Sequence, residues 1–463
     1  MWRLSVFVVV LGVLAWSAVW FADHPGDVAI RWQGYAVTAS VGVLLVLVAG
    51  VAVLWALIYH SWLWLRAGPR RFRENRAARR RERGYQALTK GLVAVAAGDA
   101  RSAQRLGREA GRLVENPLNL LLLAQAAQLD GDETKARRHF GAMLEHDETE
   151  FLGLRGLIVQ ATKAGEWGAA RDYARRAYAL RPETEWVSSA LFDLESRAGD
   201  WRAAQKALES AARHKHLNAA EAPRRRALVL AERARAMHAG GNDGDALALA
   251  REAHKLAPGL VAATALAAEL LAAQGKRRAA SRLVEDGWKR APHPDLARAF
   301  AAIAPGETAI ERVKRFERLH QRNPDHPESR IALAQAALEA ELWGSARAHL
   351  EAAAQEHPTQ RVFALLATVE ERQTGDAEAV RAWLLRAAGA AGDVAWLCGA
   401  CGAASAGWSA RCTACNAFDS LAWRVPPTAA AIVPREPETA LPAAPDEAAG
   451  TPAVVVDAAM TRE

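Results

Sequence analysis

Apolar and polar positions follow three different patterns along the 463-residue chain. Residues 4–22 and 36–59 are two apolar runs without a charged side chain. From residue 84 to about residue 392, apolar positions recur at intervals of three and four, which is typical of helices. Residues 425–463 carry many prolines and alanines and no aromatic residue, so we predict a disordered tail there.

The two uncharged runs predict a membrane hairpin over residues 1–65. At 1.5 Å per residue in a helix, the first run spans roughly 28 Å, close to the hydrocarbon thickness of a bilayer. A cleaved signal peptide is the alternative for this run, but the run is long and a second one follows after a short polar loop. Tryptophans near the ends of both runs suit the aromatic belts of membrane proteins.

An arginine-rich segment, residues 66–83, follows the second run with nine arginines against two glutamates. Positive charge beside a membrane span stays on the cytoplasmic side, so we predict two spans with both termini and the repeats in the cytoplasm. Anionic lipid is the predicted partner of this segment, because the membrane lies next to it. Nucleic acid is the alternative partner for a run of arginines, and we do not expect it here.

A recurring turn residue marks an internal repeat, with most neighbouring marks 33 or 34 positions apart. An alanine stands five positions after every mark except the last, and a proline stands seventeen positions after four of them. We interpret each unit as two antiparallel helices that turn at the mark, with the alanine allowing close approach and the proline ending the second helix. The marks are Gly98, Gly131, Gly165, Gly199, Gly241, Gly275, Glu341 and Gly375.

This register resembles the tetratricopeptide repeat, which implies an all-α solenoid of about nine units over residues 84–392. The concave surface of such a solenoid usually holds peptides or protein partners, and a spacer that binds nothing is the alternative. Two intervals depart from the period. The interval from Gly199 to Gly241 is eight residues too long and includes the sequence EAPRRR. A double period before Glu341 leaves a degenerate unit near residues 305–324.

All four cysteines of the chain lie within eighteen positions near its C-terminal end. They form two Cys-x2-Cys pairs, Cys398 with Cys401 and Cys412 with Cys415, a spacing typical of a tetrahedral thiolate site that most often holds zinc. Structural disulfides are uncommon in the cytosol, where the predicted topology places these thiols. Four thiolates leave no open coordination position, so we predict structural zinc, with rubredoxin-like iron and a dithiol redox role as alternatives.

Residues 396–424 resemble the small zinc ribbons of the rubredoxin type. Gly402 and Asn416 follow the two cysteine pairs, and both residue types tolerate the positive φ expected at such turns. About thirty residues bury too little apolar surface to fold alone, and metal binding contributes roughly 10–16 kcal/mol in zinc-finger peptides. We expect four aromatic residues to pack around the site: Trp396, Trp408, Phe418 and Trp423.

The N-terminal region resembles the HemY family of proteobacterial inner-membrane proteins. The stretches that carry the likeness are ADHPGDVAIRWQGYAVTASVGVLLVLV and RRERGYQALTKGLVAVAAGDARSAQRLGREA, and the likeness covers about residues 1–390. It implies a multi-pass inner-membrane protein with a role in late protohaem synthesis, in which it organises porphyrin-handling enzymes. An unrelated flavin-dependent oxidase shares the family's name, but this chain has no flavin fingerprint.

These features together predict a non-enzymatic, membrane-anchored scaffold. No phosphate loop, dinucleotide fingerprint or metalloprotease helix motif indicates catalysis. The rival prediction comes from the layout of repeats and ribbon, which also resembles an adaptor of lipopolysaccharide assembly that controls turnover of a biosynthetic enzyme. That adaptor has one span, so the two spans predicted here favour the haem-pathway scaffold. A haem or porphyrin carrier is a third hypothesis, for which the sequence identifies no axial ligands.

Overall fold

The computed structural model describes residues 26–32 and 35–426, together with scattered positions between residues 9 and 23. The chain divides into two compact units, Met1–Gly153 and Leu154–Glu463, which we describe separately. Most of the first predicted span and almost all of the predicted C-terminal tail lie outside the described residues.

The first described element of the N-terminal unit is a β-hairpin. Strand β1 (Asp27–Trp32) pairs antiparallel with β2 (Tyr35–Ser40). The sequence analysis took this region for a polar loop and started the second span at residue 36, whereas the structure starts the helix at Val41. The physical reason is a hairpin signal, because β-branched and aromatic residues alternate on both sides of a two-residue connection.

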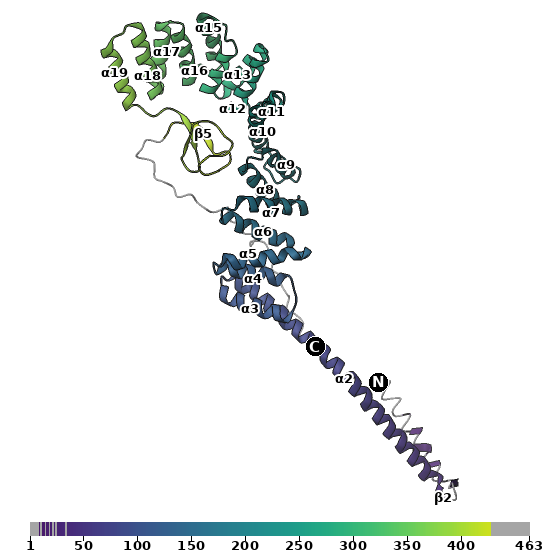
Figure 1. Cartoon of the computed structure of the whole chain (residues 1–463). Helices are drawn as coiled ribbons and strands as arrows, with labels where there is room; N and C mark the ends of the chain where they lie inside the picture. Colours follow the sequence, from purple (N-terminus) through teal and green to yellow (C-terminus); the bar gives the residue numbers. More distant parts are fainter. Residues whose placement is uncertain are drawn as a thin grey trace, which may run out of the picture. The chain divides into compact units, whose positions relative to one another are not determined.

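Helix α2 (Val41–Ala96) is continuous from the apolar segment to the repeats (Figure 1). Its section Val41–Trp62 is long and apolar enough to cross a membrane, and no part of that section is buried inside the protein. The arginine-rich residues 66–83 belong to the same uninterrupted helix. The predicted juxtamembrane segment is thus a helical extension of the apolar section.

Helices α2 to α19 follow one another in chain order and make nine successive helix pairs within the described residues. The short 3-10 helix η1 (Met143–Glu145) lies between two of them. The remaining helices are α3 (Ala100–Leu113), α4 (Leu118–Leu129), α5 (Glu133–Ala142), α6 (Asp147–Lys163), α7 (Trp167–Leu180), α8 (Glu185–Arg197), α9 (Trp201–Arg213), α10 (Ala222–Ala239), α11 (Asp243–Leu256), α12 (Val261–Ala273), α13 (Arg277–Arg290), α14 (Pro294–Ala302), α15 (Ala309–His320), α16 (Pro327–Glu339), α17 (Trp343–Glu356), α18 (Gln360–Gln373) and α19 (Ala377–Gly389).

Each mark of the sequence repeat is a residue with left-handed backbone between the two helices of a pair. The φ angles run from 57° at Glu341 to 77° at Gly98 and Gly241. Where an aspartate or asparagine follows the mark, its side chain caps the next helix. The Asp99 carboxylate, for example, accepts a hydrogen bond of 3.0 Å from the Ser102 amide. The mark therefore ends one helix and starts the next, which confirms the predicted register.

The alanine five positions after the mark is fully buried in seven helix pairs, because the two helices meet there. These alanines, each 0% exposed, are Ala103, Ala136, Ala170, Ala204, Ala246, Ala280 and Ala346. A larger side chain at this position would force the helices apart. The degenerate unit is also confirmed: it is the pair α14 and α15, whose first helix has nine residues.

A small antiparallel sheet follows α19, where the sequence predicted a zinc ribbon. Its strands are β3 (Ala395–Cys398), β4 (Ala404–Ser405) and β5 (Leu421–Arg424), in the order β4–β3–β5. Trp396 lies opposite Ser405 on one side and Trp423 on the other. The described chain is thus mostly helical, with one β-hairpin and one ribbon.

Candidate metal centre

The two cysteine pairs form two loops with matching backbone hydrogen bonds. In the first loop the Cys398 amide donates to the Ala403 carbonyl (2.9 Å), and the Gly402 amide donates to the Cys398 carbonyl (3.0 Å). The second loop repeats this pattern, with Cys412 in place of Cys398 and Asn416 in place of Gly402, at 3.0 and 2.8 Å. Each loop therefore turns the chain in the same way around its pair of thiols.

We call residues 398–402 the first knuckle and residues 412–416 the second knuckle. The last residue of each has the positive φ that the sequence analysis predicted, 76° at Gly402 and 59° at Asn416. Glycine adopts this conformation freely and asparagine tolerates it, whereas most other residues are strained there. Local sequence therefore shapes both knuckles before any metal is considered.

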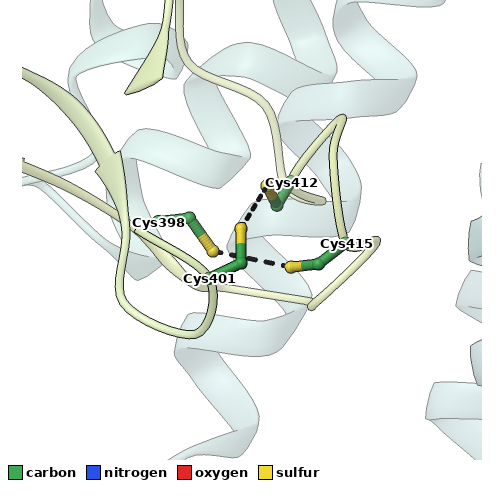
Figure 2. A group of neighbouring side chains, drawn as sticks. All are labelled: Cys398, Cys401, Cys412 and Cys415. Atoms are coloured by element: carbon green, nitrogen blue, oxygen red, sulfur yellow. Dashed lines mark hydrogen bonds between the residues drawn. The ribbon is translucent and has the colours of Figure 1, made fainter. Parts of the chain in front are cut away.

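The four sulfur atoms point toward one another at the centre of the ribbon (Figure 2). Cys398 Sγ lies 3.6 Å from Cys415 Sγ, Cys401 Sγ lies 3.8 Å from Cys412 Sγ, and all four lie within 4.8 Å of one another. Sulfurs bound tetrahedrally to one zinc at about 2.3 Å stand about 3.8 Å apart. A disulfide requires about 2.05 Å, and all four cysteines are free. The thiols are thus placed to bind one metal ion.

The surroundings give these thiols different proton affinities. Burial raises the pKa of Cys398, but contacts with the Ser420 hydroxyl and with the amides of Cys401 and Ala400 outweigh burial and lower the pKa to about 6. Burial raises the pKa of the Cys415 thiol to about 12. A bound metal requires thiolates and favours them by its own charge. Before a metal binds, Cys398 therefore ionises more readily than Cys415.

Three of the four predicted aromatic residues pack around the thiols. Trp396 is buried with the cysteines, and Trp408 and Trp423 pack against the same cluster. Phe418 differs from the prediction, because its ring meets Phe192 of α8 edge-on, with 5.1 Å between the ring centroids. The ribbon therefore has a small tryptophan-rich core and presents one aromatic ring to the repeats.

The second knuckle holds the ribbon on α8 through Arg411, whose side chain is 7% exposed. The guanidinium of Arg411 donates to the Ser196 hydroxyl, at 3.0 Å from Nε and 2.7 Å from Nη2. It also donates to the Asp193 carboxylate at 2.5 Å and to the Asp193 carbonyl at 3.1 Å. A buried cation with this many acceptors fixes the position of the knuckle relative to the helix.

Helix α10 contacts the residues just before the second knuckle. The Ala410 amide donates to the Glu232 carboxylate at 2.6 Å, and Arg235 donates to the Trp408 carbonyl at 3.0 Å. Ala410 is fully buried in a cluster that includes Ala227 and Leu228 of α10. The ribbon and α10 thus share one apolar core.

The overlong interval of the sequence repeat supplies another contact. Arg224, from the sequence EAPRRR, donates two hydrogen bonds of 2.7 Å to the Asp419 carboxylate in a bidentate pair. The extra residues between Gly199 and Gly241 therefore lie where the ribbon docks. In the sequence, the overlong interval is the feature that marks this docking surface. It does not indicate which part of the chain docks there.

The sheet side of the ribbon meets the start of α14 at His293. Its ring centroid lies 4.2 Å from that of Trp423 and 5.3 Å from that of Trp396. His293 Nδ1 accepts a hydrogen bond of 3.0 Å from the Asp295 amide, while buried Nε2 has no partner among the described residues. Burial lowers the pKa of His293 to about 4. This edge of the ribbon is therefore held by stacking around a neutral imidazole.

The ribbon covers part of the inner layer of the C-terminal unit. From α10 onward the first helices of successive pairs contact one another, α10 with α12, α12 with α14, and so on to α18. Such a continuous layer forms the inner, concave side of a curved stack. The ribbon lies against α10 and α14 of this layer and also against α8, the first helix of an earlier pair. A hollow of about 500 Å³ beyond it, lined by residues of α14, α15, α16 and α18, stays open.

Comparison with known proteins identifies the N-terminal region. The family model described as HemY protein N-terminus matches residues 26–131, which include the β-hairpin, α2 and α3. The N-terminal region of the chain is thus similar to the HemY family. A tetratricopeptide repeat model matches residues 313–369. Protein HemY of Escherichia coli strain K12 is 29% identical over 187 residues, which cover 39% of this chain and 46% of that protein. The match thus spans about half the length of that HemY protein.

A second relative matches along most of its length. The probable magnetosome protein Mms48 of Magnetospirillum gryphiswaldense is 27% identical over 435 residues, covering 91% of this chain and 93% of that protein. Among solved structures, a tetratricopeptide repeat protein from Parabacteroides merdae aligns with 15% identity and a TM-score of 0.29, covering 66% of this chain and 99% of that one.

The geometry brings all four predicted cysteines together, and their role as metal ligands stays a prediction. The sequence analysis missed the residues that hold the ribbon on the repeats, because they come from separate helices. Arg411, for instance, pairs with a residue 218 positions earlier in the chain. The residues it missed are Asp193, Ser196, Arg224, Glu232, His293, Arg411 and Asp419.

Proposed function

We propose that the protein is a non-enzymatic scaffold in the bacterial inner membrane that holds enzymes of late haem synthesis on its repeats. The observation that carries this proposal is the match of the HemY N-terminus to residues 26–131. That region joins an apolar helix directly to the first repeat helices, so it couples an anchor to a binding surface. Partners held on such repeats would stay close to the membrane, where their substrates partition.

The proposed topology is a two-span anchor with both termini in the cytoplasm. Helix α2 supplies the second span, and residues 4–22 would supply the first. The exposed arginines of α2 that follow the span support this orientation, because positive charge stays on the cytoplasmic side. Fusion of a reporter to the β-hairpin and to the C-terminus would test it, and a cytoplasmic hairpin would contradict it.

Anionic lipid is the proposed partner of the membrane-proximal arginines only. Along a continuous α2, Arg66 stands about 6 Å beyond Trp62, whereas Arg76 and Arg83 stand about 21 and 32 Å beyond it. The headgroup layer is roughly 5–8 Å thick, and charge is screened over about 8 Å at physiological salt. The predicted lipid contact at residues 66–83 is therefore proposed for residues 66–73.

Structural zinc is the proposed occupant of Cys398, Cys401, Cys412 and Cys415, with iron as the other candidate. The sulfur separations of 3.6 and 3.8 Å support a tetrahedral ion. Four thiolates complete the coordination of such an ion, so it would contribute stability to the ribbon rather than bind a substrate. Its two knuckles would be joined through the metal.

A second candidate function is a scaffold role in a magnetosome. It is favoured by the likeness to Mms48, which extends over 91% of this chain. The adaptor role in lipopolysaccharide assembly stays a prediction from the layout of repeats and ribbon. The three candidates share the anchor and the repeats, and differ in the partners that the repeats hold.

A porphyrin profile of cells depleted of this protein tests the proposal. Accumulated late porphyrin intermediates with lowered haem, restored by the full chain, are the expected result. Restoration should fail with a chain that lacks residues 1–65, because the partners would no longer be held at the membrane. A normal profile would contradict the haem-pathway scaffold, and the level of lipid A in the same cells would then test the adaptor role.

A further inference from the structure

Arg411 of the ribbon is held by a set of hydrogen-bond acceptors on α8, which we call the acidic pocket. The pocket offers three acceptors to Arg411: the Asp193 carboxylate, the Asp193 carbonyl and the Ser196 hydroxyl. The Ser196 hydroxyl donates its own proton to the Phe192 carbonyl at 2.5 Å, which leaves its lone pairs for the incoming cation. Without Arg411, this part of the surface would be an unfilled acidic pocket.

The neighbouring contacts restrict what can enter the pocket with the arginine. Ala410 is fully buried, so the position before the arginine accepts only a small side chain. Its amide donates to the Glu232 carboxylate at 2.6 Å, so a ligand must also bring a free backbone amide to α10. The ring of Phe192 offers its surface to an aromatic residue on the same ligand. The surface therefore suits a segment with a small residue followed by arginine, and an aromatic residue nearby.

The second knuckle connects this ligand to the metal site. Arg411 directly precedes Cys412, and its guanidinium also donates to the Asn416 carbonyl. The Asp419 amide donates to the Ala410 carbonyl at 2.8 Å, which ties together the two arms that touch the repeats. Loss of the metal would open the knuckle, because the ribbon's own core consists of a few side chains around the thiols. The arms would then lose the geometry that fits the pocket.

At the opposite edge of the interface between the ribbon and the repeats, one buried polar atom lacks a hydrogen bond among the described residues. His293 Nε2 is buried against the ribbon and has no hydrogen-bond partner among the described residues. An unpaired buried polar atom costs free energy that a fully matched interface would avoid. Release of the ribbon would return this atom to water. The docked state is thus held mainly by the residues on either side of the second knuckle.

We propose that the ribbon is a metal-dependent, exchangeable occupant of the inner surface of α8 and α10. With metal bound, Arg411 fills the acidic pocket and blocks it. Without metal, the pocket is open to an arginine-bearing segment of a partner protein. The inference depends on the proposed scaffold role for the partner's identity, but the pocket and its occupant are defined by this chain alone.

A binding experiment with the purified full chain in detergent tests this exchange. The probe is a labelled peptide with the sequence of residues 408–418, in which serine replaces both cysteines. Its affinity, measured by fluorescence anisotropy, should be at least about tenfold higher for chain treated with a chelator than for metal-loaded chain, because Arg411 of the docked ribbon already occupies the Asp193 carboxylate. A peptide with alanine at the position of Arg411 should not bind either form.

Three variants keep the test informative if chelation unfolds more than the ribbon. Arg411→Ala should keep its metal and bind the peptide without chelation. Arg424→Ala is the matched control, because this exposed arginine contacts the Cys398 carbonyl within the ribbon and not the repeats. It should keep its metal and exclude the peptide. Asp193→Asn in the Arg411→Ala chain should abolish peptide binding again.

Hydrogen exchange of the backbone amides in α8 and α10 is the measurement that can contradict the proposal. Arg411→Ala should raise exchange in both helices, as should chelation. If Arg411→Ala leaves their protection unchanged and does not bind the peptide, the ribbon is a permanent part of the fold. That outcome would leave the proposed haem-pathway role unaffected, because the porphyrin profile is measured in cells and does not involve this pocket.

Discussion

The two knuckles of the ribbon have nearly the same backbone and very different surroundings. Both turn through a residue with positive φ and close with the same pair of backbone hydrogen bonds. The residue before the first knuckle, Leu397, is a buried residue of β3 whose backbone pairs with Ala404 and Ala422 of the ribbon. The equivalent residue before the second knuckle, Arg411, reaches out of the ribbon and into α8.

The two knuckles therefore contribute in the same way to the predicted metal site but differently to the docking of the ribbon. The shared backbone places four sulfurs for an ion, and each knuckle contributes equally to that geometry. The residues that precede the knuckles differ, because Leu397 belongs to the ribbon's sheet while Arg411 attaches the ribbon to the repeats. A single substitution can therefore affect the metal, the docking or both, depending on the knuckle.

Removal of one thiol from either knuckle should have the largest effect, and an equal one. Cys398→Ser and Cys412→Ser should each weaken metal binding by more than about a hundredfold, which exceeds the loss from residues outside the coordination shell. Metal content per chain after gel filtration measures this. If one variant kept its metal while the other lost it, the two knuckles would not share one ion.

Substitutions at the equivalent positions Leu397 and Arg411 should separate the two roles. Leu397→Ala leaves a cavity in the ribbon and should cost about 2–4 kcal/mol of its stability, with weaker metal retention. Arg411→Ala removes the buried charge and should cost about 2–3 kcal/mol of docking with the metal retained. Denaturant titration followed by tryptophan fluorescence, with metal analysis beside it, checks both. The same metal loss in both variants would refute the separation.

Acid should loosen the sheet side of the ribbon and leave the arginine pocket intact. The folded pKa of His293, about 4, lies below its ordinary value of 6.5, so the unfolded chain binds the proton more readily. The neutral imidazole therefore contributes stability above pH 6.5 that is lost as the pH falls toward 4.

Asp295, Arg298 and Arg361 are the charged groups that act on this imidazole, and the first of them opposes the shift. Thermal unfolding of the metal-loaded chain between pH 7 and pH 5 measures the effect, which should be smaller than that of Arg411→Ala. His293→Gln should reduce the slope of the unfolding temperature against pH. An unchanged slope in this variant would show that another group titrates.

The smallest effect on stability should come from replacing the turn residue at the end of either knuckle. Gly402→Ala places a Cβ on a backbone with φ of 76°, where no other atom lies within 4 Å, so the cost is backbone strain of about 1 kcal/mol. Asn416→Gly relaxes the equivalent position and should change stability by less than about 0.5 kcal/mol. Thermal unfolding of the two variants compares them. A larger loss in Asn416→Gly would mean that the asparagine side chain has a further role.

The repeats and the four-cysteine cluster could be predicted because their signals are local. The turn glycines, the buried alanines and the two Cys-x2-Cys pairs each determine backbone or side-chain geometry within a few residues. The structure has the repeat turns at the predicted marks and brings the four thiols together. The backbone conformation of Gly402 and Asn416 was likewise predictable from residue type alone.

The docking of the ribbon could not be predicted from sequence, because it depends on where distant helices meet. Arg411 is one of many arginines in this chain, and nothing beside it indicates Asp193 as its partner. The start of α2 was missed for a different reason. Residues 36–40 are uncharged and so extend the apolar run, yet they pair with β1 as a strand. A hydropathy profile assigns such residues to a span because it reports side-chain polarity and not backbone conformation.

X-ray absorption spectroscopy of the purified full chain, together with metal analysis, tests the central claim that one metal joins the two knuckles. The account predicts one zinc per chain with four sulfur neighbours at about 2.3 Å. Cys398→Ser should lose that signal. Less than half an equivalent of zinc or iron, or a shell dominated by nitrogen and oxygen, would contradict a metal-joined ribbon.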